Sequence, residues 1–270
     1  MSTFDTIEAK RRCLKWRREI LDMSQKVGAL HIAPAFSCVE IVDVVYNNLM
    51  RLDDSGHPLD VFLMSKGHGC MAQYVVLEDR GILPKEDMER YGKDGARIGA
   101  HPDYGIPGIA ASTGSLGHGL GITAGMACTD KLQKKDTTFY CLLGDGELQE
   151  GSVWEAVMMI PNLCLSNVVA LVDYNDFQGL GRTSETHPHL LPLHDKFVQF
   201  GWEAVEVNGH NSEAIFRAVS RRSGEKPFLA VCRTVKGKGV SYMENVPIWH
   251  YRSPNPEEYQ QAVQELEASV

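Results

Sequence analysis

The stretch FYCLLGDG at residues 139–146 decides the fold, because an apolar run of strand length ends there in an acidic residue between two glycines. A second apolar run, VVALV at residues 168–172, ends in DYNDF at residues 173–177. Runs that are apolar throughout are typical of strands buried on both faces of a parallel sheet. Since ligands bind at the carboxyl ends of such strands, we expect Asp145 and Asn175 to lie together at one edge.

The residue types at these two strand ends indicate a metal site. Asp145 offers a carboxylate, Asn175 offers an amide oxygen, and the loops offer main-chain carbonyls. These hard oxygen ligands suit magnesium, which takes few protein ligands and completes its octahedron with phosphate oxygens and water. Taken alone, the GDG triplet also fits an ordinary turn. A magnesium ion clamping a diphosphate would explain how an acidic protein holds an anion.

The rest of the chain alternates between strand and helix patterns. We expect further strands at 61–64, 202–207 and 228–232, and helices at about 5–27, 69–80, 119–131, 152–160 and 212–222. This order predicts an α/β protein with a parallel sheet flanked by helices. We expect a single domain over residues 1–270, with a C-terminal helical tail at 254–270.

Two local patterns refine this expectation. Asp5 with Glu8, and Ser37 with Glu40, have the spacing of capping boxes at helix starts. Residues 92–117 contain too many glycines and prolines for a packed helix. Because a long structureless loop inside a compact domain is usually functional, we expect this segment to contribute to a site.

Composition excludes several kinds of partner. Hydrophobic residues make up 43% and charged residues 23%, and the formal net charge is -8. The charge gives no electrostatic reason to expect binding to nucleic acid or to an anionic membrane, and no apolar run has the length of a membrane span. The seven cysteines are scattered without a C-x-x-C pair, which indicates buried thiols in a reducing compartment. We therefore expect a cytoplasmic protein.

Several segments together resemble a known family. A GDG triplet with an asparagine about thirty residues later resembles the thiamine-diphosphate signature. The wider chain resembles the N-terminal part of transketolase and of the related deoxyxylulose-phosphate synthase over nearly its whole length. The segments that carry the resemblance are SKGHG at 65–69, GAHP at 99–102, GSLGHG at 114–119, LGDGELQEG at 143–151 and KGKG at 236–239. The resemblance implies the thiamine-diphosphate-binding fold, in the form of its diphosphate-binding domain.

The resemblance also implies a set of cofactor contacts. Magnesium, or another divalent cation in its place, would be held by Asp145, Asn175 and the carbonyl of Phe177. Further cofactor contacts would come from residues near the diphosphate, near the aminopyrimidine and at the subunit interface, namely His68, Gly146, Gly114, Leu116 and Glu150. Glu150 resembles the acid that reaches toward the catalytic glutamate of a partner.

Three histidines resemble the active-site histidines of the family, which lie near the substrate hydroxyls and the reactive carbon: His31, His101 and His250. Histidine suits this task because it exchanges protons near neutral pH without large tuning. Other histidines, His210 among them, receive no role. For Lys236 and Lys238, the pattern leaves open whether they steer phosphate or face solvent.

The resemblance further implies a missing half. In transketolase a second domain binds the aminopyrimidine and supplies a glutamate, yet the residues after Asn175 are accounted for by two strands, a helix, a basic turn and the tail. We expect a separate partner chain, a C-terminal transketolase subunit, in an assembly with two copies of each chain. The leading function is transfer of a two-carbon ketol unit between sugar phosphates, in pentose phosphate metabolism or the catabolism of unusual sugars.

Two alternatives stay open at this point. One is a subunit of another thiamine-diphosphate enzyme, such as a lyase, a synthase or a 2-oxoacid dehydrogenase. Its pattern would keep the GDG triplet and the asparagine but lack the SKGHG and histidine–proline segments. The other is a non-catalytic paralogue that acts by binding, and the intact pair Asp145 and Asn175 argues against it.

Overall fold

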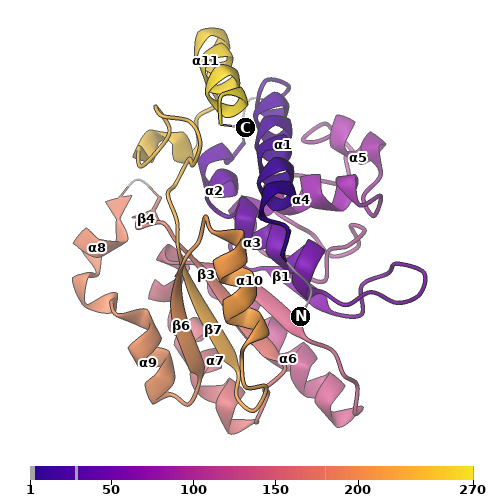
Figure 1. Ribbon diagram of the computed structural model, residues 1–270, viewed down its shortest axis with the longest axis vertical. Coiled ribbons are helices and arrows are strands. Elements are labelled where there is room, and N and C mark those ends of the chain that lie inside the picture. Colours follow the sequence, from indigo (N-terminus) through magenta and orange to yellow (C-terminus); the bar gives the residue numbers. More distant parts are fainter. Residues whose placement is uncertain (1–3, 28–29, 180, 270) are drawn as a thin grey trace.

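The computed structural model describes residues 4–27, 30–179 and 181–269. Its centre is a five-stranded parallel sheet in the order β1 (Val61–Met64), β2 (Phe139–Gly144), β3 (Val168–Tyr174), β7 (Phe228–Arg233), β6 (Glu203–Asn208) (Figure 1). The predicted α/β class and all five predicted strands are confirmed. Strands β2 and β3 pair directly, with Gly144 opposite Asp173, so the two sequence motifs do end side by side.

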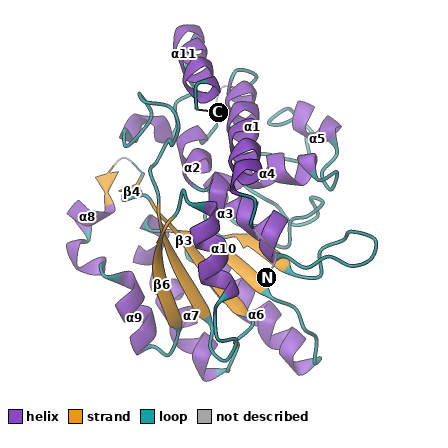
Figure 2. Cartoon of the chain, viewed as in Figure 1, coloured by secondary structure: helices purple, strands orange, loops and turns teal. Residues whose placement is uncertain are grey.

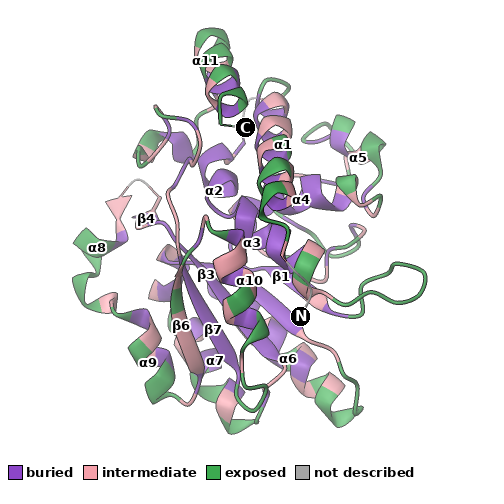
Figure 3. Cartoon of the chain, viewed as in Figure 1, coloured by how far each residue is buried: buried purple, intermediate pink, exposed green. Residues whose placement is uncertain are grey.

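The sheet is buried on both faces, as its apolar strands predict. Along β2, Tyr140 and Leu142 belong to one hydrophobic cluster, while Cys141 and Leu143 belong to the other. This alternation follows from the two-residue period of a strand. Figure 3 shows the central strands as buried, apart from β6 at the edge of the sheet.

Helices cover the two faces of the sheet (Figure 2). One cluster contains side chains from α1 (Thr6–Ser24), α2 (Ile32–Ser37), α3 (Val39–Val44), α4 (Cys70–Asp79) and α10 (Ser212–Ser220). The C-terminal helix α11 (Pro256–Glu267) packs against α1. The other cluster draws on α6 (Gly119–Leu132), α7 (Gly151–Asn162) and α9 (Leu193–Gln199). None of the helices in the described ranges combines the length and apolar character that crossing a bilayer requires.

Short elements complete the described chain. They are the helices α5 (Lys85–Glu89) and α8 (Thr183–Thr186), the strands β4 (Phe177–Gln178) and β5 (Gly181–Arg182), a π-helical turn at Val45–Leu49, and 3-10 turns at Gly67–Gly69, Gly146–Gln149, Pro188–Leu190 and Pro247–His250. Residues 92–117 form neither helix nor strand, which confirms the predicted loop.

The predicted capping role of Ser37 is wrong. Ser37 is the last residue of α2, and α3 begins only at Val39, without a side-chain cap. The Ser37 hydroxyl instead donates to Asp173 Oδ2 at 2.6 Å and lies 3.0 Å from the carbonyl oxygen of Pro34. A buried carboxylate without hydrogen-bond donors is costly, so the contact of Ser37 with Asp173 takes precedence over capping of the helix.

The helix ends also differ from the sequence expectation by a few residues. Helix α10 ends at Ser220 rather than near 222, and α11 covers Pro256–Glu267 rather than all of 254–270. At α11 the chain supplies its own start signal: Asn255 and Glu258 form a reciprocal capping box, with a proline at the first helical position.

Candidate cofactor site

A cavity of about 570 Å³ lies where β2 and β3 end. Its lining includes every residue predicted for the site, drawn from segments spread over more than two hundred positions: His31, His68, His101, Gly114, Leu116, Asp145, Gly146, Glu150, Asn175, Phe177 and His250. The fold thus brings the candidate residues together. Their individual roles stay predictions.

Asp145 has the features of a metal ligand. It follows β2 directly and is only 1% exposed, because the buried strand carries it below the surface. Its Oδ2 atom has no hydrogen-bond partner among the described residues. Burial raises the pKa of the carboxyl to about 7. A buried carboxylate oxygen without a donor is costly unless a cation meets it, so this atom fits a magnesium ligand.

Asn175 is held in one orientation on the neighbouring strand end. Its Nδ2 donates to Asp173 Oδ2 at 3.1 Å, and its Oδ1 accepts the backbone N–H of Phe177 at 3.1 Å. These two bonds identify the amide oxygen as the atom on the Phe177 side. Asp176, which lies between Asn175 and Phe177 in the chain, adopts a left-handed conformation with φ of +64°. The turn brings the chain back so that Asn175 and Phe177 both line the cavity.

Gly146 lets the two strand ends approach each other. A Cβ at this position would lie 2.9 Å from Cβ of Gln178 and 3.7 Å from the carbonyl oxygen of Phe177. Only glycine fits this approach without displacement of the Gln178 segment. Asp145, Asn175 and Phe177 line the same cavity, and a carboxylate, an amide oxygen and a main-chain carbonyl are a donor set that fits magnesium.

Asp173, which the sequence analysis left without a role, organises this region. It is fully buried and pairs with the equally buried ammonium of Lys66. It also accepts hydrogen bonds from Ser37, Thr234 and Asn175. Burial raises the pKa of Asp173, but the charge of Lys66 and the hydrogen bonds from Lys66, Ser37 and Thr234 together lower it below its ordinary value. A charged residue directly after an apolar strand was the signal in the sequence.

Glu147 is a second buried carboxylate that the sequence analysis missed. It accepts from the hydroxyl of Ser65, from the backbone N–H of Gly117 at 2.9 Å and from that of Gly144 at 3.3 Å. Burial raises its pKa. Glu147 thereby ties three of the segments that carry the family resemblance to one another.

Glycines also shape the wall formed by the long loop. At Gly67 a Cβ would lie 2.7 Å from the backbone nitrogen of Gly114. Gly114 itself has a φ of +132°, and a Cβ there would lie 2.7 Å from the His101 ring. Side chains at either position would push the loop away from the strand ends. Leu116 and Glu150 line the same cavity, and Glu150 is exposed at its rim.

Four histidines form one cluster in the cavity. The ring centroid of His31 lies 5.9 Å from those of His68 and His101 and 5.4 Å from that of His250. His68 and His250 stack at 5.3 Å. Tyr251 adds a half-exposed ring 4.4 Å from His250. Rings in such contact can meet several hydroxyl groups of one bound molecule at once.

Three of these histidines, His31, His68 and His250, are held neutral. Burial lowers the pKa of His31 to about 4 and that of His250 to about 3, with nearby cations adding to the effect. Burial and the adjacent Lys66 take the pKa of His68 well below its ordinary value. A neutral imidazole offers one N–H donor and one lone-pair acceptor to a bound hydroxyl group.

Lys236 is a buried cation beside this cluster. It is 1% exposed, and its Nζ donates to His250 Nδ1 at 2.8 Å. It also lies 5.1 Å from the ring centroid of Phe177. Burial, and next Lys66, lower its pKa to about 8, and no described carboxylate pairs with its ammonium. Of the two sequence alternatives for Lys236, facing solvent is therefore excluded; Lys238 instead pairs with Glu244 at 3.1 Å.

The chain matches a known family and several of its members. Residues 9–266 match the transketolase family model described as the thiamine diphosphate binding domain. The chain is 38% identical over 262 residues to an apulose-4-phosphate transketolase subunit of Phocaeicola vulgatus, covering 95% of this chain and 92% of that one. It is 36% identical over 257 residues to 6-deoxy-6-sulfo-D-fructose transketolase subunit SqwG of Clostridium sp., covering 93% of each.

Longer relatives match over part of their length. Human transketolase is 34% identical over 250 residues, which are 90% of this chain and 39% of the human protein. The solved transketolase of Leishmania mexicana has the same fold, with a TM-score of 0.87 and 24% identity over 99% of this chain and 42% of that one. The chain belongs to the transketolase family and corresponds to its N-terminal, thiamine diphosphate-binding domain.

Proposed function

We propose that this chain is the cofactor-holding subunit of a two-subunit transketolase and binds thiamine diphosphate through a magnesium ion. The observation that carries the proposal is the unpartnered, buried Oδ2 of Asp145 beside the oriented amide of Asn175. Magnesium would bind these oxygens and the Phe177 carbonyl. Gly146 would let the diphosphate approach the backbone.

Buried cations supply the charge that such a ligand needs. Lys236 has no carboxylate partner in the described chain, and it lies next to the cavity-lining His250 and Phe177. Burial, and after it repulsion from Lys66, lowers the pKa of Lys236, and an anionic diphosphate there would offset both effects. Buried charges of this kind are tolerated when a ligand or ion pairs them.

The reaction follows from the cofactor and the histidine cluster. The thiazolium ring of the cofactor supplies an electron sink for the carbanion left when a ketose is cleaved beside its carbonyl. His31, His101 and His250 would bind the sugar hydroxyls and move protons on and off them. His68 would contact the diphosphate, while Gly114 and Leu116 would pack against the aminopyrimidine.

A partner completes the proposed enzyme. Two of the similar proteins are named as transketolase subunits, for apulose 4-phosphate and for 6-deoxy-6-sulfo-D-fructose. By analogy, residues 1–270 would act as one domain beside a C-terminal transketolase subunit that carries the aminopyrimidine site and a catalytic glutamate. Glu150 at the cavity rim would face that subunit. The assembly would hold two copies of each subunit in the cytoplasm and act on sugar phosphates.

The experiment mixes this chain with candidate C-terminal subunits and measures ketol transfer over a panel of ketose phosphates. The proposal expects no turnover by either chain alone, magnesium-dependent turnover by the correct mixture, and loss of turnover with Asp145→Asn. Full activity of this chain alone would refute the two-subunit arrangement. Magnesium-dependent cofactor binding without turnover in any mixture would favour the non-catalytic paralogue.

A further inference from the structure

We propose that His210 is a positioning residue for Lys236, and that it acts by fastening the turn that follows β7 to the buried carboxylate of Glu40. His210 lies in the connection between β6 and α10 and does not line the cavity with the histidine cluster. The inference rests on the proposed function, because it gives a purpose to the position of Lys236 beside the candidate diphosphate site.

The hydrogen bonds of His210 fix its tautomer. Its Nε2 lies 2.8 Å from the backbone nitrogen of Val235, which can only donate, so Nε2 accepts. Its Nδ1 lies 3.0 Å from Oε2 of Glu40, a carboxylate that accepts, so Nδ1 carries the proton. The neutral imidazole thus links an acceptor on α3 to a donor in the turn after β7.

Glu40 is a rigid anchor for this link. Its carboxylate is 8% exposed, and Oε2 also accepts from Arg17 Nη2 at 2.6 Å. Arg17 is itself buried and donates to the carbonyl of Phe36 at 2.9 Å. An anchor held by a buried arginine on α1 moves little, because shifting it would expose or unpair a buried charge.

The segment that carries His210 is pressed onto the end of β7. The backbone nitrogen of Gly209 donates to the carbonyl of Arg233 at 2.7 Å. A Cβ at Gly209 would lie 2.4 Å from Cγ2 of Thr234. The side chain of Asn208 accepts the N–H of His210 at 2.9 Å and holds that residue in place. The close approach is what lets an imidazole reach the backbone of Val235.

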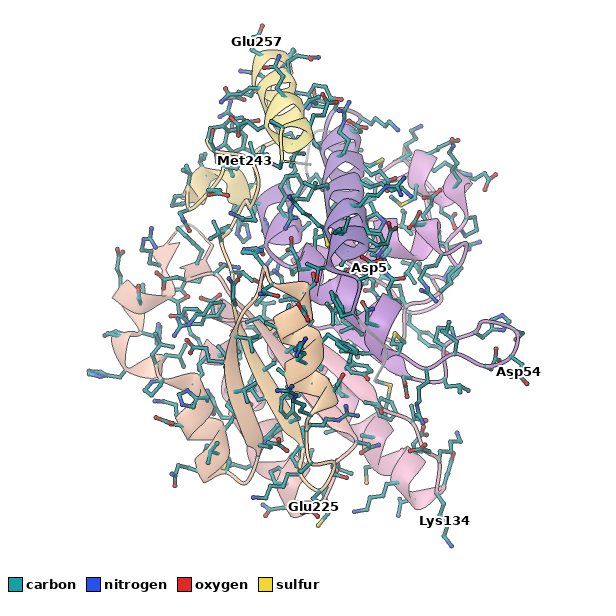
Figure 4. All side chains as sticks on the ribbon, in the orientation of Figure 1. Asp5, Asp54, Lys134, Glu225, Met243 and Glu257 are labelled. Atoms are coloured by element: carbon teal, nitrogen blue, oxygen red, sulfur yellow. The ribbon has the colours of Figure 1, made fainter. Side chains whose placement is uncertain are left out.

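The position of Val235 also fixes the position of Lys236. Lys236 directly follows Val235, and the backbone nitrogen of Gly237 donates to the carbonyl of Ala33 on α2 at 3.2 Å. At Gly237, where φ is +77°, a Cβ would lie 2.6 Å from the carbonyl oxygen of Met243, the residue that Figure 4 labels in this turn. The turn is therefore compact and fastened on two sides, by His210 before Lys236 and by α2 after it.

Two substitutions separate the two bonds of His210. The amide of His210→Gln reaches as far as Nε2 and can still accept from Val235. The amide of His210→Asn reaches only as far as Nδ1 and can still donate to Glu40. Each variant breaks one of the two hydrogen bonds, and urea unfolding of both variants checks that they stay folded.

The measured quantity is the magnesium-dependent affinity of the full chain for thiamine diphosphate. We expect His210→Asn and His210→Gln each to weaken binding by about tenfold, the worth of one hydrogen bond, because the link from Glu40 to Val235 is lost when either bond is broken. In a Lys236→Met background, His210→Asn should weaken binding by less than about twofold, because residues that act through one another are not additive.

The outcomes distinguish the two proposals. No loss for either His210 variant, a loss for only one of them, or an undiminished loss in the Lys236→Met background would overturn the positioning role while leaving the proposed function standing. A wild-type chain that does not bind thiamine diphosphate with magnesium would overturn the proposed function and this inference with it.

Discussion

Replacing Asp173 by asparagine should destabilise the protein strongly, because it leaves a charge buried without its partner. The carboxylate of Asp173 is 0% exposed and the Lys66 side chain 1% exposed, so neither group can turn to water. Breaking a buried pair from one side typically costs about 3–5 kcal/mol of the free energy of unfolding. Asparagine keeps the shape, and its one oxygen can still accept from Ser37, while its NH₂ group cannot accept from Thr234.

A double-mutant cycle tests the cause. Lys66→Met removes the stranded ammonium, so Asp173→Asn with Lys66→Met should lose about 2 kcal/mol less than the sum of the two single variants. The assay is urea unfolding followed by the fluorescence of the buried Trp16 and Trp202. Breaking the exposed pair of Arg217 and Glu213 with Glu213→Gln should cost about 0.5 kcal/mol or less.

Two outcomes would contradict the predicted coupling of Lys66 and Asp173. If Asp173→Asn costs less than about 1 kcal/mol, the variant does not leave Lys66 as an uncompensated buried charge. If the double variant loses the full sum of the two single variants, Lys66 and Asp173 do not act on each other.

Three further predictions concern the walls of the site. The cofactor-free chain should lose stability as pH falls from about 6.5 toward 4. Folding lowers the pKa of His31 to about 4 and that of His250 to about 3, so the unfolded chain binds these protons first. Unfolding curves at several pH values check this, and a stability that does not change with pH would contradict it. Gly117→Ala should lower the free energy of unfolding in urea by about 1–3 kcal/mol, because φ is +89° and the new Cβ would lie 2.6 Å from Cβ of Glu150. An unchanged unfolding midpoint would show that the loop relaxes without strain. Glu147→Gln should cost about 1–3 kcal/mol, since an amide NH₂ cannot accept from the donors that the carboxylate satisfies; thermal and urea unfolding that match wild type would rule this out.

Much of the fold was readable from the sequence, since its signals are local. A strand that is apolar throughout, such as 168–172, is favourable only when both faces of its sheet are buried. The GDG triplet at the end of the neighbouring strand marks the edge of the sheet where ligands bind. Residues from four of the five segments chosen by resemblance line one cavity. The predicted helix start at Ser37 was wrong, because the Ser37 hydroxyl donates to the carboxylate of Asp173, which lies 136 positions away in the sequence.

The part of the site that could not be predicted consists of buried charges. Lys66 and Glu147 stand inside segments recognised as a whole, yet nothing local says that one pairs with Asp173 and the other with Ser65. Lys236 sits in a glycine-rich basic turn that reads equally well as solvent-facing. Its burial depends on where the fold places α2 and His250, which local patterns do not specify.

The most direct test of the account is a calorimetric titration of the full chain with thiamine diphosphate, in magnesium and in excess EDTA. We expect saturable binding of one cofactor per chain in magnesium and none in EDTA. Asp145→Asn should weaken binding by about a hundredfold or more, at least the loss seen when outer-shell partners of a metal are removed. Binding that is equal in EDTA, or equal in Asp145→Asn and wild type, would contradict the claim that Asp145 holds the cofactor through a metal ion.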